Sequence, residues 1–222
     1  MKLFRLYQLF ALGATMLLFP ACDGILDGIY DQPRTTTGYG FNPNGDGTGT
    51  LFIDATDYAQ WTYINLHTEE IDSTRITGTD GTEVPMGENA SLPAEWDFAI
   101  HRYDVKTNGG AVLETEATNL NAVLLMSSIP TGNYVSDTET QITIDMSGMM
   151  EGNILYATSS YNAELAKWLD VDTSTMPPIY TLSNKVYILR MADGTYAALR
   201  LTAFRNEQNT SGHLTIEYAY PL

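Results

Sequence analysis

Apolar and polar residues alternate most clearly near the end of the chain. The segment His213–Tyr220 is apolar at every second position, with Leu214, Ile216, Tyr218 and Tyr220 on one face of an extended strand. Two similar runs precede it, Lys185–Met191 and Tyr196–Phe204, and the pair Asp193-Gly194 between them favours a tight hairpin turn. The pattern therefore predicts an antiparallel meander of three strands at the carboxyl end.

Shorter strand-like runs occupy the chain before this meander. Branched and aromatic residues favour strands at Leu51–Ile53, Trp61–Leu66, Trp96–Val105 and Gln141–Ile144. After the third of these runs, Thr107-Asn108-Gly109-Gly110 indicates a turn, and Ala111–Glu114 is expected to return as the hairpin partner of Trp96–Val105.

Helical patterns are sparse. Ala122–Met126 is expected to form a short helical turn before Pro130. Asn162–Leu169 is the better helix, because Asn162 can cap it and its apolar residues share one face. The predicted fold class is therefore mainly β, with antiparallel sheets, the carboxyl-terminal meander and one or two short helices.

Residues 1–22 have the architecture of a bacterial lipoprotein signal peptide. Lys2 and Arg5 form a short basic region, and the apolar run Leu6–Phe19 is too short to span a bilayer comfortably. A small residue then precedes Cys22, so cleavage there would leave the Cys22 thiol to carry a lipid anchor. An ordinary secretory signal with a coincidental cysteine is the alternative. Because Cys22 is the only cysteine, no intramolecular disulfide can form.

Residues 23–50 are predicted to be a flexible tether, and residues 51–222 to be the folded domain. The tether is rich in glycine, threonine and proline-containing polar sequence and offers few apolar anchors. Within it, Asn42-x-Asn44-x-Asp46-Gly47 is spaced like the first half of a calcium loop. Ile53 stands where such a loop needs its closing glutamate, so calcium binding is not expected.

The charge balance excludes one class of partner. The chain has 27 acidic and 11 basic residues, with a formal net charge of −16. Binding to nucleic acid depends on neutralising phosphates with lysine and arginine, so nucleic acid is not an expected partner.

Motifs typical of enzymes are absent from the sequence. It contains no His-Glu-x-x-His zinc helix, no Gly-x-Ser-x-Gly elbow, no phosphate-binding loop and no Cys-x-x-Cys pair. The three histidines, His67, His101 and His213, have no partner histidine at a spacing typical of metal ligands, and we interpret them as structural or surface residues. We therefore predict a binding protein and no catalytic residues.

The stretch Asp145–Pro178 holds four of the nine methionines, namely Met146, Met149, Met150 and Met176, and no histidine. Its neighbours Gly148 and Pro177 favour loops for these methionines. Thioether sulfur is a soft, neutral ligand that suits copper(I) or haem iron. The alternative is that these methionines only fill irregular gaps in the core, which is their commonest use.

A longer resemblance decides between these interpretations. The segment Trp96–Asn108 resembles the signature segment of the HmuY family, and the similarity continues through Met176-Pro177-Pro178, Tyr187–Arg190, Asp193–Tyr196 and Gly212–Pro221. Members of this family are haem-binding lipoproteins of Gram-negative anaerobes that act as haemophores. The resemblance implies a mainly β fold in which two finger-like loops close over one haem, and each loop offers one axial ligand.

The resemblance also implies a ligand set. Some members use two histidines and others use methionines, and this chain has no histidine in either loop. Met176 is the expected ligand from the second loop. From the first loop we expect Met149, with Met150 next and Met146 third. The implied cofactor is haem b, held preferentially as ferrous haem because a thioether is a poor match for ferric iron.

The implied role is that of a haemophore anchored by lipid in the outer membrane. It would face the cell surface and pass haem to an outer-membrane transporter. Release of the protein from the cell is a further implied possibility. Two alternatives remain at this point. The same fold could bind a different porphyrin or apolar ligand without iron ligation, or the chain could be a carbohydrate-binding or adhesin lipoprotein whose aromatic residues stack on sugars.

Overall fold

The computed structural model describes residues 38–86, 91–175 and 177–222. The predicted signal peptide, Cys22, the first part of the predicted tether and Met176 lie outside the described residues. The chain divides into two units, Met1–Pro33 and Arg34–Leu222, and all of the described residues belong to the second. No helix within those described segments is long and apolar enough to cross a membrane.

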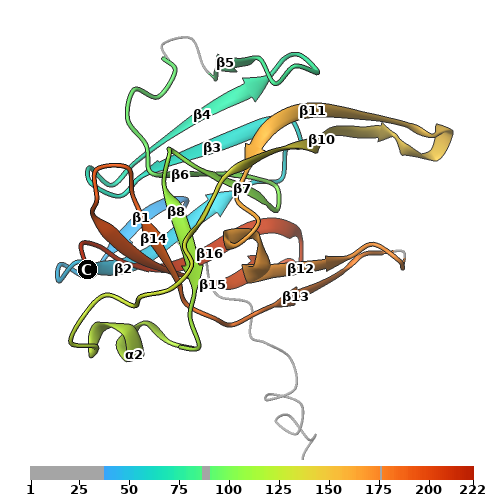
Figure 1. Cartoon of the computed structure of the whole chain (residues 1–222). Helices are drawn as coiled ribbons and strands as arrows, with labels where there is room; N and C mark the ends of the chain where they lie inside the picture. Colours follow the sequence, from blue (N-terminus) through green and yellow to red (C-terminus); the bar gives the residue numbers. More distant parts are fainter. Residues whose placement is uncertain (1–37, 87–90, 176) are drawn as a thin grey trace, which may run out of the picture. The chain divides into compact units, whose positions relative to one another are not determined.

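The larger sheet has seven strands in the order β1-β2-β16-β15-β14-β8-β9 (Figure 1). Their bounds are β1 Gly40–Pro43, β2 Thr48–Asp54, β8 Ala111–Glu114, β9 Val135–Ser136, β14 Tyr187–Arg190, β15 Tyr196–Arg205 and β16 Ser211–Ala219. Strands β14, β15 and β16 pair antiparallel in sequence order, which confirms the predicted meander. Both faces of β16 are covered, because Leu214, Ile216 and Tyr218 enter one core cluster and Ala219 enters another.

Strands β1 and β2 correct the predicted boundary of the tether. The segment 23–50 is predicted to lack structure, yet it contains β1 and the first residues of β2; these strands form a hairpin, and β2 pairs with β16 along seven residues. The calcium-like loop is the turn of this hairpin. Asp46 Oδ1 accepts hydrogen bonds from the Thr48 backbone N–H and from its hydroxyl, so the carboxylate stabilises the turn. The edge of β16 opposite β15 is occupied by β2, and β1 pairs in turn with β2, which explains why a polar, glycine-rich segment becomes ordered.

The smaller sheet has five strands in the order β5-β4-β3-β6-β7. Their bounds are β3 Gln60–Asn65, β4 Glu70–Ile76, β5 Glu83–Pro85, β6 Phe98–His101 and β7 Asp104–Thr107. The predicted single strand Trp96–Val105 is wrong, because β6 and β7 form a tight hairpin. Arg102 turns the chain with φ of 54°, a conformation that side-chain-bearing residues rarely adopt, so no glycine or proline marks this turn.

The sequence predicted that Ala111–Glu114 returns as the hairpin partner of Trp96–Val105. This prediction is wrong, because strand β8 does not lie beside β6 and β7. It pairs instead with β14 and β9 in the larger sheet, so the chain crosses between sheets at Gly109-Gly110. A Cβ atom at Gly110 would lie 2.7 Å from the backbone oxygen of Arg190. The two glycines therefore permit a close crossover rather than a hairpin turn.

Two further antiparallel hairpins project from the sheets, and Figure 1 shows both extending toward the same side. The first consists of β10 Thr138–Gly148, the 3₁₀ turn η2 Met149–Glu151 and β11 Asn153–Tyr161. The second consists of β12 Leu169–Asp172 and β13 Ile179–Leu182. We call them the long hairpin and the short hairpin.

The helical elements are few, as expected, but each differs in its bounds. Helix α2 spans Leu120–Leu124 and is capped by the side chain of Asn119. The second predicted helix is only the 3₁₀ turn η3, Leu165–Trp168. Asn162 does cap it, since its side-chain oxygen accepts a hydrogen bond from the Leu165 backbone N–H at 2.9 Å.

The main core cluster lies between the sheets and includes the fully buried Phe98, Trp168 and Tyr187. A second cluster joins the long hairpin to the smaller sheet through Ile142 and Ala157, which pack against Trp61 and Tyr63. Beside it, the Lys106 ammonium lies 4.1 Å from the centre of the Trp61 ring and 2.9 Å from a Glu83 carboxylate oxygen. Lys106 is 7% exposed, so its charge is held in an aromatic and carboxylate cage.

Candidate functional site

The two hairpins share one buried polar root. Asn162, fully buried between β11 and η3, donates from its amide to the Val135 carbonyl at 3.0 Å and to an Asp137 carboxylate oxygen at 2.8 Å. Asp137 also accepts from the backbone N–H of Thr107 at 2.6 Å and from its hydroxyl at 2.9 Å. Because β11 ends and β12 begins on either side of this network, it fixes the place where both hairpins leave the sheets.

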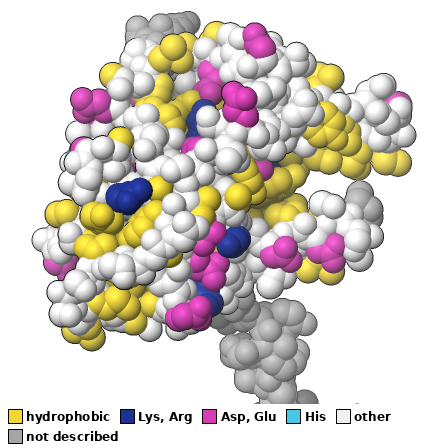
Figure 2. All heavy atoms as spheres, viewed as in Figure 1, with side chains coloured by type: hydrophobic (Ala, Val, Ile, Leu, Met, Phe, Trp, Pro, Cys, Tyr) yellow, Lys and Arg dark blue, Asp and Glu magenta, His cyan; other side chains and the backbone are white. Residues whose placement is uncertain are grey.

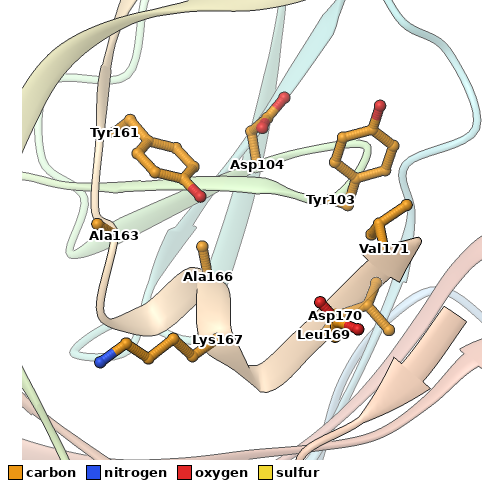
Figure 3. A pocket seen from close by; sticks show the side chains of 9 residues that line it. All are labelled: Tyr103, Asp104, Tyr161, Ala163, Ala166, Lys167, Leu169, Asp170 and Val171. Atoms are coloured by element: carbon orange, nitrogen blue, oxygen red, sulfur yellow. The ribbon is translucent and has the colours of Figure 1, made fainter. Parts of the chain in front are cut away.

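A pocket of about 500 Å³ opens at that place. Its lining comes from the β6–β7 turn, from the end of β11 and from the segment that leads through η3 into β12 (Figure 3). Tyr103 and Tyr161 stand on opposite sides of the pocket with Asp104 between them, and Val171 lies beside Tyr103. The volume falls in the range of about 300–1,000 Å³ that small-molecule sites occupy.

The charged groups of this pocket are mainly acidic. Asp104 and Asp170 line it, and the one lysine in its lining, Lys167, is paired with Glu164 at 2.6 Å. Burial raises the pKa of Tyr103 and of Tyr161, and the Asp104 carboxylate adds to both increases. Both tyrosines therefore keep their protons and present neutral rings and hydroxyl groups to the pocket.

Apolar side chains remain exposed along the hairpins above the pocket. Leu155 and Tyr156 of the long hairpin are 50% and 44% exposed, and Ile179 of the short hairpin is 52% exposed. Figure 2 shows hydrophobic side chains gathered in the notch between the two arms. We call this notch the inter-hairpin cleft. Large apolar residues left open to water on facing elements are typical of a ligand-binding surface.

Three of the four candidate methionines lie near the tip of the long hairpin. Met146 is a partly buried residue of β10, where the register of the hairpin shifts. Met149 and Met150 both belong to the 3₁₀ turn η2 at the tip; Met149 is partly buried, whereas Met150 is 86% exposed. Met176 falls between β12 and β13 in the sequence and lies outside the described residues, so its pairing with Met149 stays a prediction.

The histidines lie away from these tips, within the sheets and their turns. Each has polar partners in the fold: His67 contacts Asp97 and Asp193, His101 contacts Asp104, and His213 contacts Tyr39. These contacts fit the interpretation of the three histidines as structural or surface residues. Among the residues that the structure describes, no group of three histidine, cysteine, aspartate or glutamate side chains could hold a metal ion.

The family described as HmuY protein matches residues 57–218 of this sequence. The chain belongs to the HmuY family. The match begins after β2 and covers the smaller sheet, both hairpins and most of the carboxyl-terminal meander, which is nearly all of the predicted domain. No curated protein matches the chain.

Solved structures of HmuY relatives share this fold. A chain described as a lipoprotein from Bacteroides fragilis NCTC 9343 is 48% identical, with a TM-score of 0.75, and the alignment covers 86% of this chain and 99% of that one. A chain described as HmuY-like and haem-binding, from Bacteroides vulgatus ATCC 8482, is 50% identical with a TM-score of 0.74, covering 83% and 99%. The apo HmuY analog of Tannerella forsythia is 26% identical with a TM-score of 0.64, covering 79% and 96%.

The pocket at the hairpin roots is the part of this HmuY-family chain that sequence reasoning missed. Tyr103, Tyr161 and Asp170 come from three separate segments and form no motif. Tyr103 and Asp104 were interpreted as the inside of one continuous strand, and Asn162 only as a helix cap. The one available signal was the run Arg102-Tyr103-Asp104, whose polar residues interrupt an otherwise apolar strand pattern.

Proposed function

We propose that this protein binds haem b in the inter-hairpin cleft, as a haemophore-like lipoprotein rather than an enzyme. One observation carries the proposal: two hairpins leave a common root above an aromatic pocket of about 500 Å³ and hold exposed apolar residues on both arms. A flat, apolar macrocycle fits such a cleft, with its charged groups toward water. The relative from Bacteroides vulgatus, which is described as haem-binding, supports the same ligand class.

The donor atoms near the hairpin tips fit haem iron. Met149 and Met150 bring thioethers to the turn of the long hairpin, and Met176 belongs to the connection between the strands of the short one. We propose Met149 and Met176 as the axial ligands, with Met150 and then Met146 as alternates on the first hairpin. When bound, the haem supplies an iron that accepts one ligand from each side of its plane.

Thioether ligation sets the preferred oxidation state. Methionine sulfur is soft and uncharged, and its ligation raises the reduction potential of haem iron. We therefore propose that ferrous haem binds more tightly than ferric haem. By linkage, the logarithm of the ratio of the two affinities is proportional to the shift of the haem reduction potential on binding, so one measurement checks the other.

We further propose that a lipid on Cys22 anchors the protein in the outer membrane and that an outer-membrane transporter receives the haem. The relative from Bacteroides fragilis, which is described as a lipoprotein, supports the anchor. Acyl chains contribute about 0.8 kcal/mol for each buried methylene, so two or three chains make anchoring effectively permanent. Cell-surface exposure and release from the cell are parts of the same proposal.

Haem titration of the chain from Asp23 onward, which contains the whole compact unit Arg34–Leu222, tests the haem site. Under dithionite, we expect a sharp low-spin ferrous Soret band with resolved α and β bands. The pair Met149→Ala with Met176→Ala is expected to remove this spectrum and to weaken binding at least about a hundredfold, because loss of even an outer partner of a metal ligand costs about ten- to a hundredfold.

Met126→Ala is the matched control, since Met126 is 46% exposed and follows α2, outside both hairpins. It is expected to leave spectrum and affinity unchanged. An unaltered spectrum in the double variant would exclude the proposed ligands, and no spectral change at micromolar haem in either oxidation state would exclude haem binding. Equal affinity for iron-free protoporphyrin would favour a porphyrin site without iron ligation.

A further inference from the structure

Carboxylates face the floor of the inter-hairpin cleft. Asp104, at the start of β7, is mostly buried, with 16% of its side chain exposed, and the exposed Asp170 of β12 belongs to the same pocket lining. The neutral aromatic rings of Tyr103 and Tyr161 flank this floor on opposite sides (Figure 3). A ligand edge that reaches this floor therefore meets negative charge between aromatic rings.

Besides His101, whose ring nitrogens face the Asp104 carboxylate and the Tyr58 carbonyl, the nearby lysine and arginine have other partners. Figure 3 shows the Lys167 side chain directed away from Tyr161 and Asp104, and its ammonium lies 2.6 Å from Glu164 Oε2. Arg102, which precedes Tyr103, donates to the Ser211 carbonyl at 3.1 Å, and its guanidinium lies 4.9 Å from the centre of the Tyr58 ring. Neither cation is placed to neutralise an anionic group at the floor.

The distribution of carboxylates distinguishes tetrapyrroles from one another. Haem b carries both propionates on one edge, and the opposite edge carries only methyl and vinyl groups. The iron complex of coproporphyrin III carries one propionate on every pyrrole, so each of its edges is anionic. An anionic edge brought against the carboxylates of Asp104, which also contacts the His101 ring, and Asp170 in a partly dehydrated pocket is disfavoured, since juxtaposed like charges suppress wrong partners.

We propose that Asp104 and Asp170 make the cleft floor a charge filter that accepts only a carboxylate-free porphyrin edge. The filter orients haem with its propionates toward the open side of the cleft and rejects tetrapyrroles with carboxylates on every ring. This inference rests on the proposed haem site, because the floor acts on a ligand held between the hairpins. It adds the substrate class, namely tetrapyrroles whose carboxylates are confined to one edge.

Parallel titrations with haem and with iron coproporphyrin III, both under dithionite, test the filter. The chain from Asp23 onward is expected to bind haem at least about tenfold more tightly than the tetracarboxylate. In the variant Asp104→Asn with Asp170→Asn, most of this ratio is expected to disappear through tighter binding of iron coproporphyrin III. The matched control, Asp72→Asn with Glu207→Gln, makes the same change in net charge at exposed positions of β4 and the β15–β16 loop and is expected to keep the ratio.

Asp104 lies 3.1 Å from the buried His101 ring nitrogen, so the double variant can lose stability as well as charge. The single variant Asp170→Asn leaves this contact intact and tests the charge alone. This single variant is expected to lose part of the ratio while its thermal unfolding matches that of the parent chain. Failure of the parent chain to bind haem would overturn the proposed function. Binding of haem with no preference over iron coproporphyrin III, or a ratio that survives in both Asn variants, would overturn the filter alone.

Discussion

The long and short hairpins differ in length but share one principle of construction. The long hairpin has strands of 11 and 9 residues with two register shifts, whereas each strand of the short hairpin has 4 residues in unbroken register. In the long hairpin, no residue from 143 to 156 is buried, so Ile142 and Ala157 are its last buried pair. In the short hairpin, Leu169 is buried at the root and residues 170–175 and 177–182 are not.

This comparison separates stability from binding. The long hairpin is anchored at its root by buried residues and leaves its outer part without a core, and such a part opens at low free-energy cost. Along the short hairpin, Val171, Tyr180 and Leu182 pack against the main core cluster. The long arm therefore has more freedom to adjust than the short one, in which the Tyr180 ring lies 4.9 Å from the ring of the core residue Phe204, centre to centre. We expect substitutions at the roots to alter unfolding and substitutions along the arms to alter ligand affinity.

The largest expected effect is at the root that both hairpins share. Asn162→Ala removes two bonds donated to Val135 and Asp137 and one accepted from the Leu165 backbone N–H, all in the interior. Since each buried polar group left without a partner costs about 1–3 kcal/mol, the free energy of unfolding is expected to fall by about 3–5 kcal/mol. Urea denaturation measures this change, and hydrogen exchange is expected to rise in both hairpins.

Asn153→Ala is the matched control, because Asn153 is exposed and begins β11 near the tip. Its effect on unfolding is expected to stay within about 0.5 kcal/mol. Faster exchange confined to one hairpin in the Asn162 variant would show that the hairpins have separate roots.

A second prediction applies one substitution to each hairpin. Ile142 is 2% exposed at the root of the long hairpin, and Ile142→Ala is expected to lower the free energy of unfolding by about 2–4 kcal/mol through a cavity. Ile179 is 52% exposed on the short hairpin, so Ile179→Ala is expected to change unfolding by less than about 0.5 kcal/mol. It is instead expected to weaken haem binding about five- to tenfold, since exposed apolar area is lost from a hairpin that we propose holds the haem.

Calorimetry of unfolding gives the stability of each variant, and haem titration gives its affinity for haem. Loss of affinity without loss of stability in Ile142→Ala, or the reverse in Ile179→Ala, would contradict the separation of root from arm.

The parts that the sequence predicted well are those whose signal is local. The strands β14, β15 and β16 alternate in polarity and are joined by recognisable turns, so their order and pairing follow from neighbouring residues. The capping role of Asn162 is local as well, because a cap acts within three residues.

The parts that were missed depend on tertiary context. Arg102 makes a turn with neither glycine nor proline, because the surrounding strands and its own contacts with Ser211 and Tyr58 hold it in an unusual conformation. Strand β1 looked like a tether because its order depends on the edge offered by β2 and β16. The pocket floor consists of residues from separate segments of the chain. The periodicity of apolar residues along the sequence does not indicate which distant segments come into contact.

A third prediction sharpens the comparison at the tip of the long arm. Met149 and Met150 are adjacent in η2, yet Met149 is partly buried and Met150 is 86% exposed. We expect Met149→Ala to weaken ferrous haem binding at least about tenfold and Met150→Ala to weaken it less than about threefold. The ferrous spectrum of each single variant identifies the ligand directly, and a larger loss in Met150→Ala would exchange their roles.

The smallest expected effect is a pH dependence of stability that comes from His67. The histidines lie in the sheets and their turns, whereas the two hairpins contain none. His67 lies 3.2 Å from Asp97 and 3.0 Å from Asp193. Burial lowers the pKa of His67, but the hydrogen bonds and charges of Asp193 and Asp97 outweigh it and raise the pKa above its ordinary value of 6.5. A raised folded-state pKa stabilises the fold fully below the unfolded value, and this stabilisation is lost as pH rises through the folded value.

The gain in stability over a His67→Gln variant is therefore expected to be present at about pH 5.5 and to vanish by about pH 8.5. It is expected to stay below about 1 kcal/mol, because the side chain is 37% exposed and the ion pairs are screened. Asp193 remains charged throughout, since hydrogen bonds from Thr195 and then from His67 lower its pKa to about 2. Denaturation curves at the two pH values measure the difference, and a constant gap between parent and variant would contradict it.

Haem affinity is expected to be flat across the same range, because a thioether does not titrate and neither hairpin carries a histidine. The two readouts therefore diverge with pH: stability changes through His67 in the sheets, while binding at the hairpin tips does not. Ferrous haem titrations between about pH 6 and pH 8.5 provide the comparison. A several-fold loss of affinity toward the acidic end would indicate a protonatable axial ligand and would contradict ligation by methionine at both tips.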